Sequence, residues 1–188
     1  MATILNGNKT ALLVVDAQVG AMADVWDYPR IVQNIKTVVE KARKDGVPVI
    51  WVQHADTELV QDSADWQIVP ELAPAEGEPR IYKNFNSSFE ETPLEEVLAK
   101  LGVSHIVLVG ACTNWCIRAT AYGALDRGYD LTLVRDAHTT VDTVLKDGSK
   151  IAAKDIALDL NISMSWLNYP GRKNAAVAAV DLDFAKAL

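Results

Sequence analysis

Three residues whose types can together perform nucleophilic catalysis each stand at or just past the end of a short apolar run: Asp16, Lys83 and Cys116. A neighbouring ammonium favours the thiolate form of a cysteine, and a carboxylate can accept the proton of the thiol. If these three side chains meet, they form an activated nucleophile. Taken singly, each also has a plainer explanation: the aspartate as a turn or cap residue, the lysine as a solvated charge and the cysteine as a small buried hydrophobe.

The elements that precede these residues alternate in a way that predicts a parallel sheet. Residues 11–15 form an apolar run typical of a strand buried on both faces, and further strands are expected at 47–53, 81–83, 105–109 and 130–135. Helices are expected between them, at residues 27–46, 92–101 and 114–127. Strand–helix–strand alternation implies right-handed crossovers, and ligands of parallel sheets bind beyond the carboxyl ends of the strands. The sequence therefore predicts that the three reactive side chains share one rim of the sheet.

The C-terminal third has weaker patterns. Residues 141–160 are expected to be helical with a break near Gly148, residues 162–167 form the last expected strand, and residues 172–188 are expected as a tail. The tail carries apolar residues at 175–180, which predict a subunit contact or packing on its own subunit. No repeat or linker divides the chain, so residues 1–188 are predicted to form a single domain: a three-layer α/β/α sandwich with a mostly parallel, Rossmann-like sheet.

Composition excludes several classes of function. The chain has 188 residues, 49% of them hydrophobic, with 18 Lys and Arg against 25 Asp and Glu, a net charge of −7. This acidic balance argues against nucleic acid and anionic membranes as partners, since phosphate binding needs clustered basic residues. There is no apolar run long enough to span a bilayer and no signal peptide pattern, and two cysteines are too few for a disulfide framework. These features predict a cytoplasmic protein.

Four segments resemble the motif blocks of the isochorismatase-like cysteine hydrolases. They are Val-Val-Asp-Ala-Gln at 14–18, Lys83 followed by Ser-Ser-Phe at 87–89, Gly-Ala-Cys-Thr-Asn-Trp-Cys-Ile-Arg-Ala-Thr-Ala at 110–121, and Asp-Ala-His-Thr-Thr at 136–140. This superfamily includes nicotinamidases, carbamoylsarcosine and ureide amidohydrolases, and isochorismatases. The resemblance implies a catalytic triad of Asp16, Lys83 and Cys116, no required cofactor, a small-molecule substrate and a homo-oligomer.

The same resemblance implies a reaction. Isochorismatases that cleave a vinyl ether lack the nucleophilic cysteine, whereas this chain retains Cys116, which favours hydrolysis of a carbonyl–nitrogen bond of a small amide or ureide through a thioester. Asp16 would act as general base and then acid, and Lys83 would hold the carboxylate. The backbone N–H groups of Cys112 and Cys116 would form the oxyanion hole. In the resembled family a cis peptide bond turns the first of these N–H groups inward, which places that bond between Ala111 and Cys112.

Five further residues stand in or beside the motif blocks and are candidate substrate contacts: Gln18, Trp26, Phe85, Asn114 and Trp115. Apolar side chains among them could wall a pocket, although core or subunit contacts explain the aromatic residues equally well. Many members of the family have aspartate in place of Asn114, so the role of that position stays open.

Two other kinds of protein remain possible from the sequence. Cys112 and Cys116 could be a redox pair of a non-catalytic protein, although their spacing is not the usual Cys-x-x-Cys, and a related enzyme could hydrolyse another bond, as in isochorismate hydrolysis. No metal is expected, because His54 and Asp56 stand alone while His105 and His138 are distant in sequence. His54 is instead expected to be a hydrogen-bonded polar group at a strand end.

Overall fold

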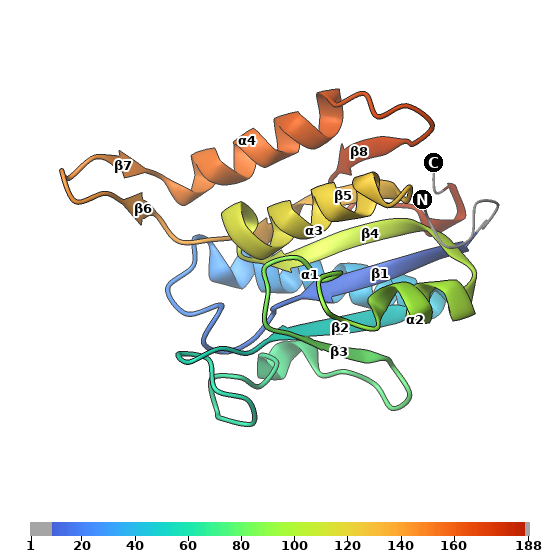
Figure 1. Cartoon of the computed structure of the whole chain (residues 1–188), viewed down its shortest axis with the longest axis horizontal. Coiled ribbons are helices and arrows are strands. Elements are labelled where there is room, and N and C mark those ends of the chain that lie inside the picture. Colours follow the sequence, from blue (N-terminus) through green and yellow to red (C-terminus); the bar gives the residue numbers. More distant parts are fainter. Residues whose placement is uncertain (1–8, 187–188) are drawn as a thin grey trace.

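The computed structural model describes residues 9–186, and these form a parallel sheet with helices on both faces (Figure 1). The sheet has six strands in the order β3-β2-β1-β4-β5-β8, and every neighbouring pair is parallel. The strands are β1 (Lys9–Val15), β2 (Val49–His54), β3 (Arg80–Lys83), β4 (Val103–Ala111), β5 (Asp130–Thr139) and β8 (Asn174–Val177). The predicted parallel sheet is confirmed.

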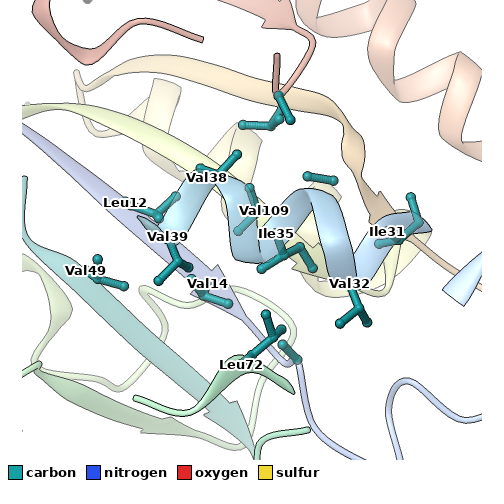
Figure 2. Packing of buried hydrophobic residues seen from close by; sticks show 14 of the residues in the cluster. Leu12, Val14, Ile31, Val32, Ile35, Val38, Val39, Val49, Leu72 and Val109 are labelled. Carbon is teal, nitrogen blue, oxygen red and sulfur yellow. The ribbon is translucent and has the colours of Figure 1, made fainter. Parts of the chain in front are cut away.

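The helices divide between the two faces of this sheet. Helix α1 (Tyr28–Lys44) covers one face, while α2 (Leu94–Leu101), α3 (Arg118–Asp126) and α4 (Ala153–Trp166) cover the other. Figure 2 shows Ile35, Val38 and Val39 of α1 beside Leu12 and Val14 of β1. Short helical turns η1 (Pro70–Leu72), η2 (Thr113–Ile117) and η3 (Phe184–Lys186) complete the described elements. The predicted three-layer α/β/α sandwich is therefore confirmed.

Strand β1 explains why its sequence is a continuous apolar run. Leu12 and Val14 pack on the α1 side, whereas Ala11, Leu13 and Val15 pack on the side of α2, α3 and α4. All five are fully buried, because a central strand of a parallel sheet has a helical layer on each face. The strand ends at Val15, directly before Asp16.

Gly110 allows β4 to approach β1 closely at this end of the sheet. The residue pairs with Val15 and has a φ of +125°, which side chains other than that of glycine rarely adopt. A Cβ atom at this position would lie 1.9 Å from the backbone oxygen of Val15. The glycine thus brings the turn that carries Cys116 next to the end of the strand that carries Asp16.

The predictions for residues 141–167 are right in part: residues 153–160 are helical and the chain turns at Gly148, but residues 141–152 are not helical and residues 162–167 are not a strand. The first part is an antiparallel hairpin of β6 (Thr143–Val144) and β7 (Lys150–Ile151), which turns at Asp147 and Gly148 and extends beyond the sheet at the left of Figure 1. The predicted strand at 162–167 belongs largely to α4, where Leu160 and Met164 are buried one helical turn apart.

Of the two alternatives for the tail at 172–188, packing on its own subunit is the one found for its described residues. Residues 174–177 form β8, the edge strand beside β5, and Ala179, Leu182 and Phe184 pack into the cluster on the α1 face. This segment therefore packs on its own subunit. Large exposed apolar side chains lie instead on the outer side of α4, at Leu158, Ile162 and Trp166, and on the β6–β7 hairpin.

Within residues 9–186, the helices are all too short or too polar to cross a lipid bilayer.

The close approach at Gly110 predicts a large loss of stability for Gly110→Ala. Relief of the contact with Val15 requires the two strand ends to separate, so we expect the free energy of unfolding to fall by more than about 3 kcal/mol. Gly148→Ala is the matched control: its φ is +84° but no atom lies within 4 Å of the added Cβ. That variant should lose only about 1 kcal/mol. Urea denaturation of both variants measures the difference, and equal losses would contradict the steric explanation.

Candidate active site

The carboxyl ends of β1, β3 and β4 bring together the three residues predicted from the sequence. Asp16 follows β1 directly and has a φ of 49°, a left-handed conformation uncommon outside glycine. Lys83 is the last residue of β3, and Cys116 lies in η2 after β4. All three are buried, with exposed fractions of 2%, 2% and 8%. Because β2 lies between β1 and β3, only a long side chain such as that of lysine spans the gap to Asp16.

The Lys83 ammonium is the centre of this cluster. It donates hydrogen bonds to Asp16 Oδ2 at 2.8 Å and to Cys116 Sγ at 3.2 Å, and it lies 3.3 Å from His54 Nδ1. Among the described residues, no group meets the other carboxylate oxygen, Asp16 Oδ1, at ordinary hydrogen-bonding geometry, although this atom is buried. One carboxylate oxygen is therefore held by the lysine and the other is free to accept a proton.

Burial controls the protonation of the nucleophile. It raises the pKa of the Cys116 thiol well above the usual range, the Asp16 carboxylate raises this pKa further, and Lys83 opposes both effects. Burial likewise raises the pKa of Asp16, while Lys83 lowers it. Lys83 thus acts in the expected direction, towards the thiolate, but burial and Asp16 outweigh it and favour the protonated thiol.

A buried histidine anchors the turn that carries Cys116. His138, at the end of β5, hydrogen bonds through Nδ1 to Thr113 Oγ1 at 2.8 Å and through Nε2 to Asn161 Oδ1 at 2.9 Å. Burial lowers its pKa to about 4, so the ring is neutral at pH 7. The residues of the turn form one π-helical turn, in which Cys112 O accepts the N–H groups of Trp115 and Ile117. His138 therefore connects β5, α4 and the nucleophile turn.

The segment before this turn has the conformation implied by the family resemblance. The peptide bond between Ala111 and Cys112 is cis. The Cys112 N–H makes no hydrogen bond to any other group within residues 9–186. Both Cys112 and Cys116 are free thiols, and both line the cavity described next.

A cavity of about 650 Å³ is lined by Asp16 and Cys116, with Lys83 buried behind them. This volume suits a small organic molecule. Its wall comes from the loop after β1, the loop after β2, Asn86 and the nucleophile turn. The lining residues are Asp16, Val19, Gly20, Ala21, Ala23, His54, Asp56, Glu58, Leu59, Asp65, Asn86, Cys112, Trp115 and Cys116.

Of the five candidate substrate contacts, Trp115 alone is among these lining residues, and its side chain is 58% exposed. Gln18 is fully buried, and its amide bonds to the backbone of His54 and Trp66. Asn114 accepts a hydrogen bond from the Thr140 hydroxyl at 2.7 Å. The Gln18 amide and the Asn114 amide oxygen thus both bond within the protein.

The other two aromatic candidates lie outside the cavity. Trp26 lines a separate depression with Arg30, whose guanidinium lies 5.4 Å from the indole centroid, and Phe85 is 45% exposed. Sequence reasoning missed Asn86, Glu58 and Asp65 as lining residues. Asn86 follows Lys83 by three positions, which is a usable signal, whereas the loop that carries the two acidic residues has no periodicity that would place it.

His54 is the hydrogen-bonded polar group expected at the end of β2. Its Nε2 lies 3.1 Å from Asp56 Oδ2, and its backbone N–H donates to Gln18 Oε1. His105 and His138 are buried in the sheet, away from the cavity lining. Across residues 9–186 no three His, Cys, Asp or Glu side chains are grouped so that they could hold a metal ion.

Comparison with known proteins identifies the class to which this fold and site belong. Residues 10–160 match the model of the isochorismatase domain. A secreted isochorismatase effector of Verticillium dahliae is 31% identical over 159 residues, which cover 79% of this chain and 83% of that protein. A streptothricin hydrolase of Streptomyces noursei is also 31% identical, over 70% of this chain but only 55% of its own length.

The fold agrees with a solved structure as well. A crystal structure of an isochorismatase from Pseudomonas putida KT2440 superposes with a TM-score of 0.83 and 29% sequence identity, over 94% of this chain and 93% of that one. The chain belongs to the isochorismatase family of hydrolases.

The electrostatics of the site predict how alkylation of Cys116 depends on pH. In the wild type, the rate of reaction with iodoacetamide should be low at pH 7 and should rise only above the ordinary thiol range near about 8.5. Asp16→Asn removes the carboxylate that raises the thiol pKa and leaves Lys83, so its alkylation profile should shift to lower pH. Lys83→Met should shift it to higher pH.

Mass spectrometry of the Cys116 peptide measures both profiles, with the Cys112 peptide of the same digest as the internal reference. An Asp16→Asn profile that coincides with the wild type, or lies at higher pH, would show that the carboxylate does not control the thiol.

Proposed function

We propose that the protein hydrolyses a carbonyl–nitrogen bond of a small amide or ureide, with Cys116 as nucleophile. The observation that carries this proposal is the position of the Lys83 ammonium within hydrogen-bonding distance of both Asp16 Oδ2 and Cys116 Sγ. A thiol and a carboxylate that line one cavity, with a fixed cation in contact with both, are the parts that acyl transfer to sulfur requires.

In the first half of the reaction, Cys116 Sγ attacks the substrate carbonyl carbon while its proton passes to the Asp16 carboxylate. Lys83 stabilises the negative charge that moves from the carboxylate to sulfur and on to the carbonyl oxygen. The tetrahedral intermediate then collapses, the C–N bond breaks, and the nitrogen takes the proton from Asp16 as it leaves. The products of this half are an amine, or ammonia, and a thioester on Cys116.

In the second half, water attacks the thioester while Asp16 accepts one of its protons. The C–S bond breaks, the acid leaves, and the thiolate regains its proton from Asp16. The raised pKa of Asp16 suits this cycle, because it makes the carboxylate a stronger base for the thiol proton, which it then gives to the leaving nitrogen. Amide and water are consumed, and acid and amine are released.

We place the carbonyl oxygen of the intermediate at the N–H groups of Cys112 and Cys116. The support is that Cys112 lines the cavity and that its N–H makes no other hydrogen bond to the described residues. Two backbone donors near the sulfur would stabilise the oxyanion without a metal.

A panel of primary amides and ureides, assayed for ammonia release, tests this function. Cys116→Ala should lose activity by about a thousandfold or more, because it removes the nucleophile. Cys112→Ala should retain most activity, since it keeps the backbone N–H, and circular dichroism checks that both variants fold. An acyl adduct of the Cys116 peptide, trapped with a slow substrate, identifies the thioester by mass.

The same panel separates the alternatives. Ammonia release that persists in Cys116→Ala would contradict the mechanism. Hydrolysis of isochorismate with no turnover of amides would favour the alternative in which the enzyme cleaves another bond, as in isochorismate hydrolysis. A reversible Cys112–Cys116 disulfide in a protein without turnover would favour the redox function.

We further propose a cytoplasmic homo-oligomer. The exposed apolar side chains of α4, Leu158, Ile162 and Trp166, follow one another at one-turn spacing, which is typical of a helix that packs on another surface. Light scattering should give a mass above 20.5 kDa for the wild type. Ile162→Lys should reduce that mass, whereas Lys154→Glu on the same helix should not. A wild-type monomer would contradict the oligomer.

A further inference from the structure

The charged groups on the wall of the active-site cavity are nearly all of one sign. Asp16, Asp56, Glu58 and Asp65 line it, and its lining residues include neither lysine nor arginine. The one nearby ammonium, that of Lys83, has a fully covered side chain, and Asp16 balances its charge. The remaining carboxylates therefore leave the cavity strongly negative.

Two of these carboxylates are unpaired. The side chains of Glu58 and Asp65 are exposed and form no ion pair or hydrogen bond with other residues in the range 9–186. Asp56 accepts the N–H groups of Glu58 and Leu59 through Oδ1, which keeps its pKa below the usual range and hence keeps it charged. Asp16 also lines the cavity, and its buried Oδ1 accepts no hydrogen bond from the part of the chain that the structure describes.

The acidic segment is fixed to the loop that follows Asp16. The Gly20 N–H donates to Asp65 O at 2.8 Å, and the Val19 N–H donates to Gln67 O at 2.8 Å. The side chains of Leu59 and Asp65 also lie close to the Gly20 backbone, since an added Cβ on Gly20 would lie 2.9 Å from Leu59 Cδ1 and 3.1 Å from Asp65 Cβ. The carboxylates thus belong to a positioned wall and not to a freely moving loop.

An aromatic side chain lines the same cavity. Trp115 precedes the nucleophile and is more than half exposed, although indoles are usually buried. An indole face binds an ammonium or a guanidinium, and nearby carboxylates strengthen that attraction. Carboxylates with an exposed indole form a wall suited to a cationic group, whereas an anion would meet repulsion from the two unpaired carboxylates.

We propose that the substrate of this site is a cation: a small amide or ureide that carries an ammonium or guanidinium group away from the carbonyl that Cys116 attacks. The inference rests on the proposed hydrolysis for the bond that is broken, and it adds the charge of the molecule that is bound. Glu58, Asp65 and Trp115 bind the cationic group, while the carbonyl lies over Cys116. A dicarboxylate such as isochorismate does not fit a cavity of this charge.

Three primary amides that differ only at the far end of a short chain test this inference: ε-aminocaproamide (cationic), ε-hydroxycaproamide (neutral) and adipamate (anionic). Their binding to the full-length Cys116→Ala protein is measured by calorimetry at low and high salt. We expect ε-aminocaproamide to bind about tenfold tighter than the hydroxyl analogue, and adipamate to bind most weakly. Added salt should reduce the difference, because the carboxylates are exposed.

A matched pair of variants assigns the preference to the acidic wall. Glu58→Gln with Asp65→Asn should reduce the preference for the cation over the hydroxyl analogue to about twofold. Glu40→Gln with Glu96→Gln removes the same charge from exposed positions on α1 and α2, outside the cavity lining, and should leave the preference unchanged. A preference that persists in the first pair, or falls equally in both, would overturn the assignment.

The outcome is separable from that of the proposed function. Equal affinity for the three amides, no measurable binding of any of them, or a preference for adipamate overturns the inference. Tighter binding of the cation with no ammonia released by the wild type from any amide supports the charge preference and counts against hydrolysis of a C–N bond.

Discussion

The ammonium of Lys83 is shielded from water, and a charge in such a place is stable only beside an opposite charge and with its hydrogen bonds made. Asp16 supplies that charge. The hydrogen bond between the two side chains therefore fixes the distance between the ends of β1 and β3, with β2 between them. Removal of one partner would leave the other charge buried and unpaired, at a cost of about 3–5 kcal/mol. The Lys83–Asp16 pair proposed for catalysis thus also connects the ends of the strands structurally. Because Lys83 donates a hydrogen bond to Cys116 as well, the position of the Cys116 side chain depends on the same pair.

The parts of the molecule that sequence predicted well are those in which burial leaves a regular pattern. Strand β1 is apolar without interruption because both faces are covered, and a polar residue such as Asp16 then marks the rim. The C-terminal elements gave no such signal. The apolar residues of 162–167 alternate as in a strand, yet Met164 belongs to a helix, and the true edge strand at 174–177 is rich in alanine, which rarely favours a strand. Local preference there was overridden by packing against β5.

Proximity to a motif in the sequence did not predict which side chains line the cavity. Gln18 stands two residues from Asp16 but its amide is used by the backbone of two loops, whereas Asp65 lies far along the chain and reaches the wall through backbone contacts with Gly20. The sequence predicted the direction in which Lys83 acts on Cys116, but not the size of the opposing effect. How deeply a thiol and a cation are buried is a property of the whole fold, and here desolvation of the Cys116 thiol outweighs the cation.

The groups proposed for catalysis and the residues that line the far wall of the cavity lie on different elements of the fold. Strand ends and the turn after Gly110 hold the former, whereas the loop after β2 supplies Glu58 and Asp65. Strand ends tolerate little change, because their residues are buried and paired with a neighbouring strand, while a surface loop accepts new residues at small cost in stability. Such a division makes the scaffold evolvable. A mutational library confined to residues 57–65 would sample new ligands while the nucleophile keeps its place, and natural divergence is free to follow the same route.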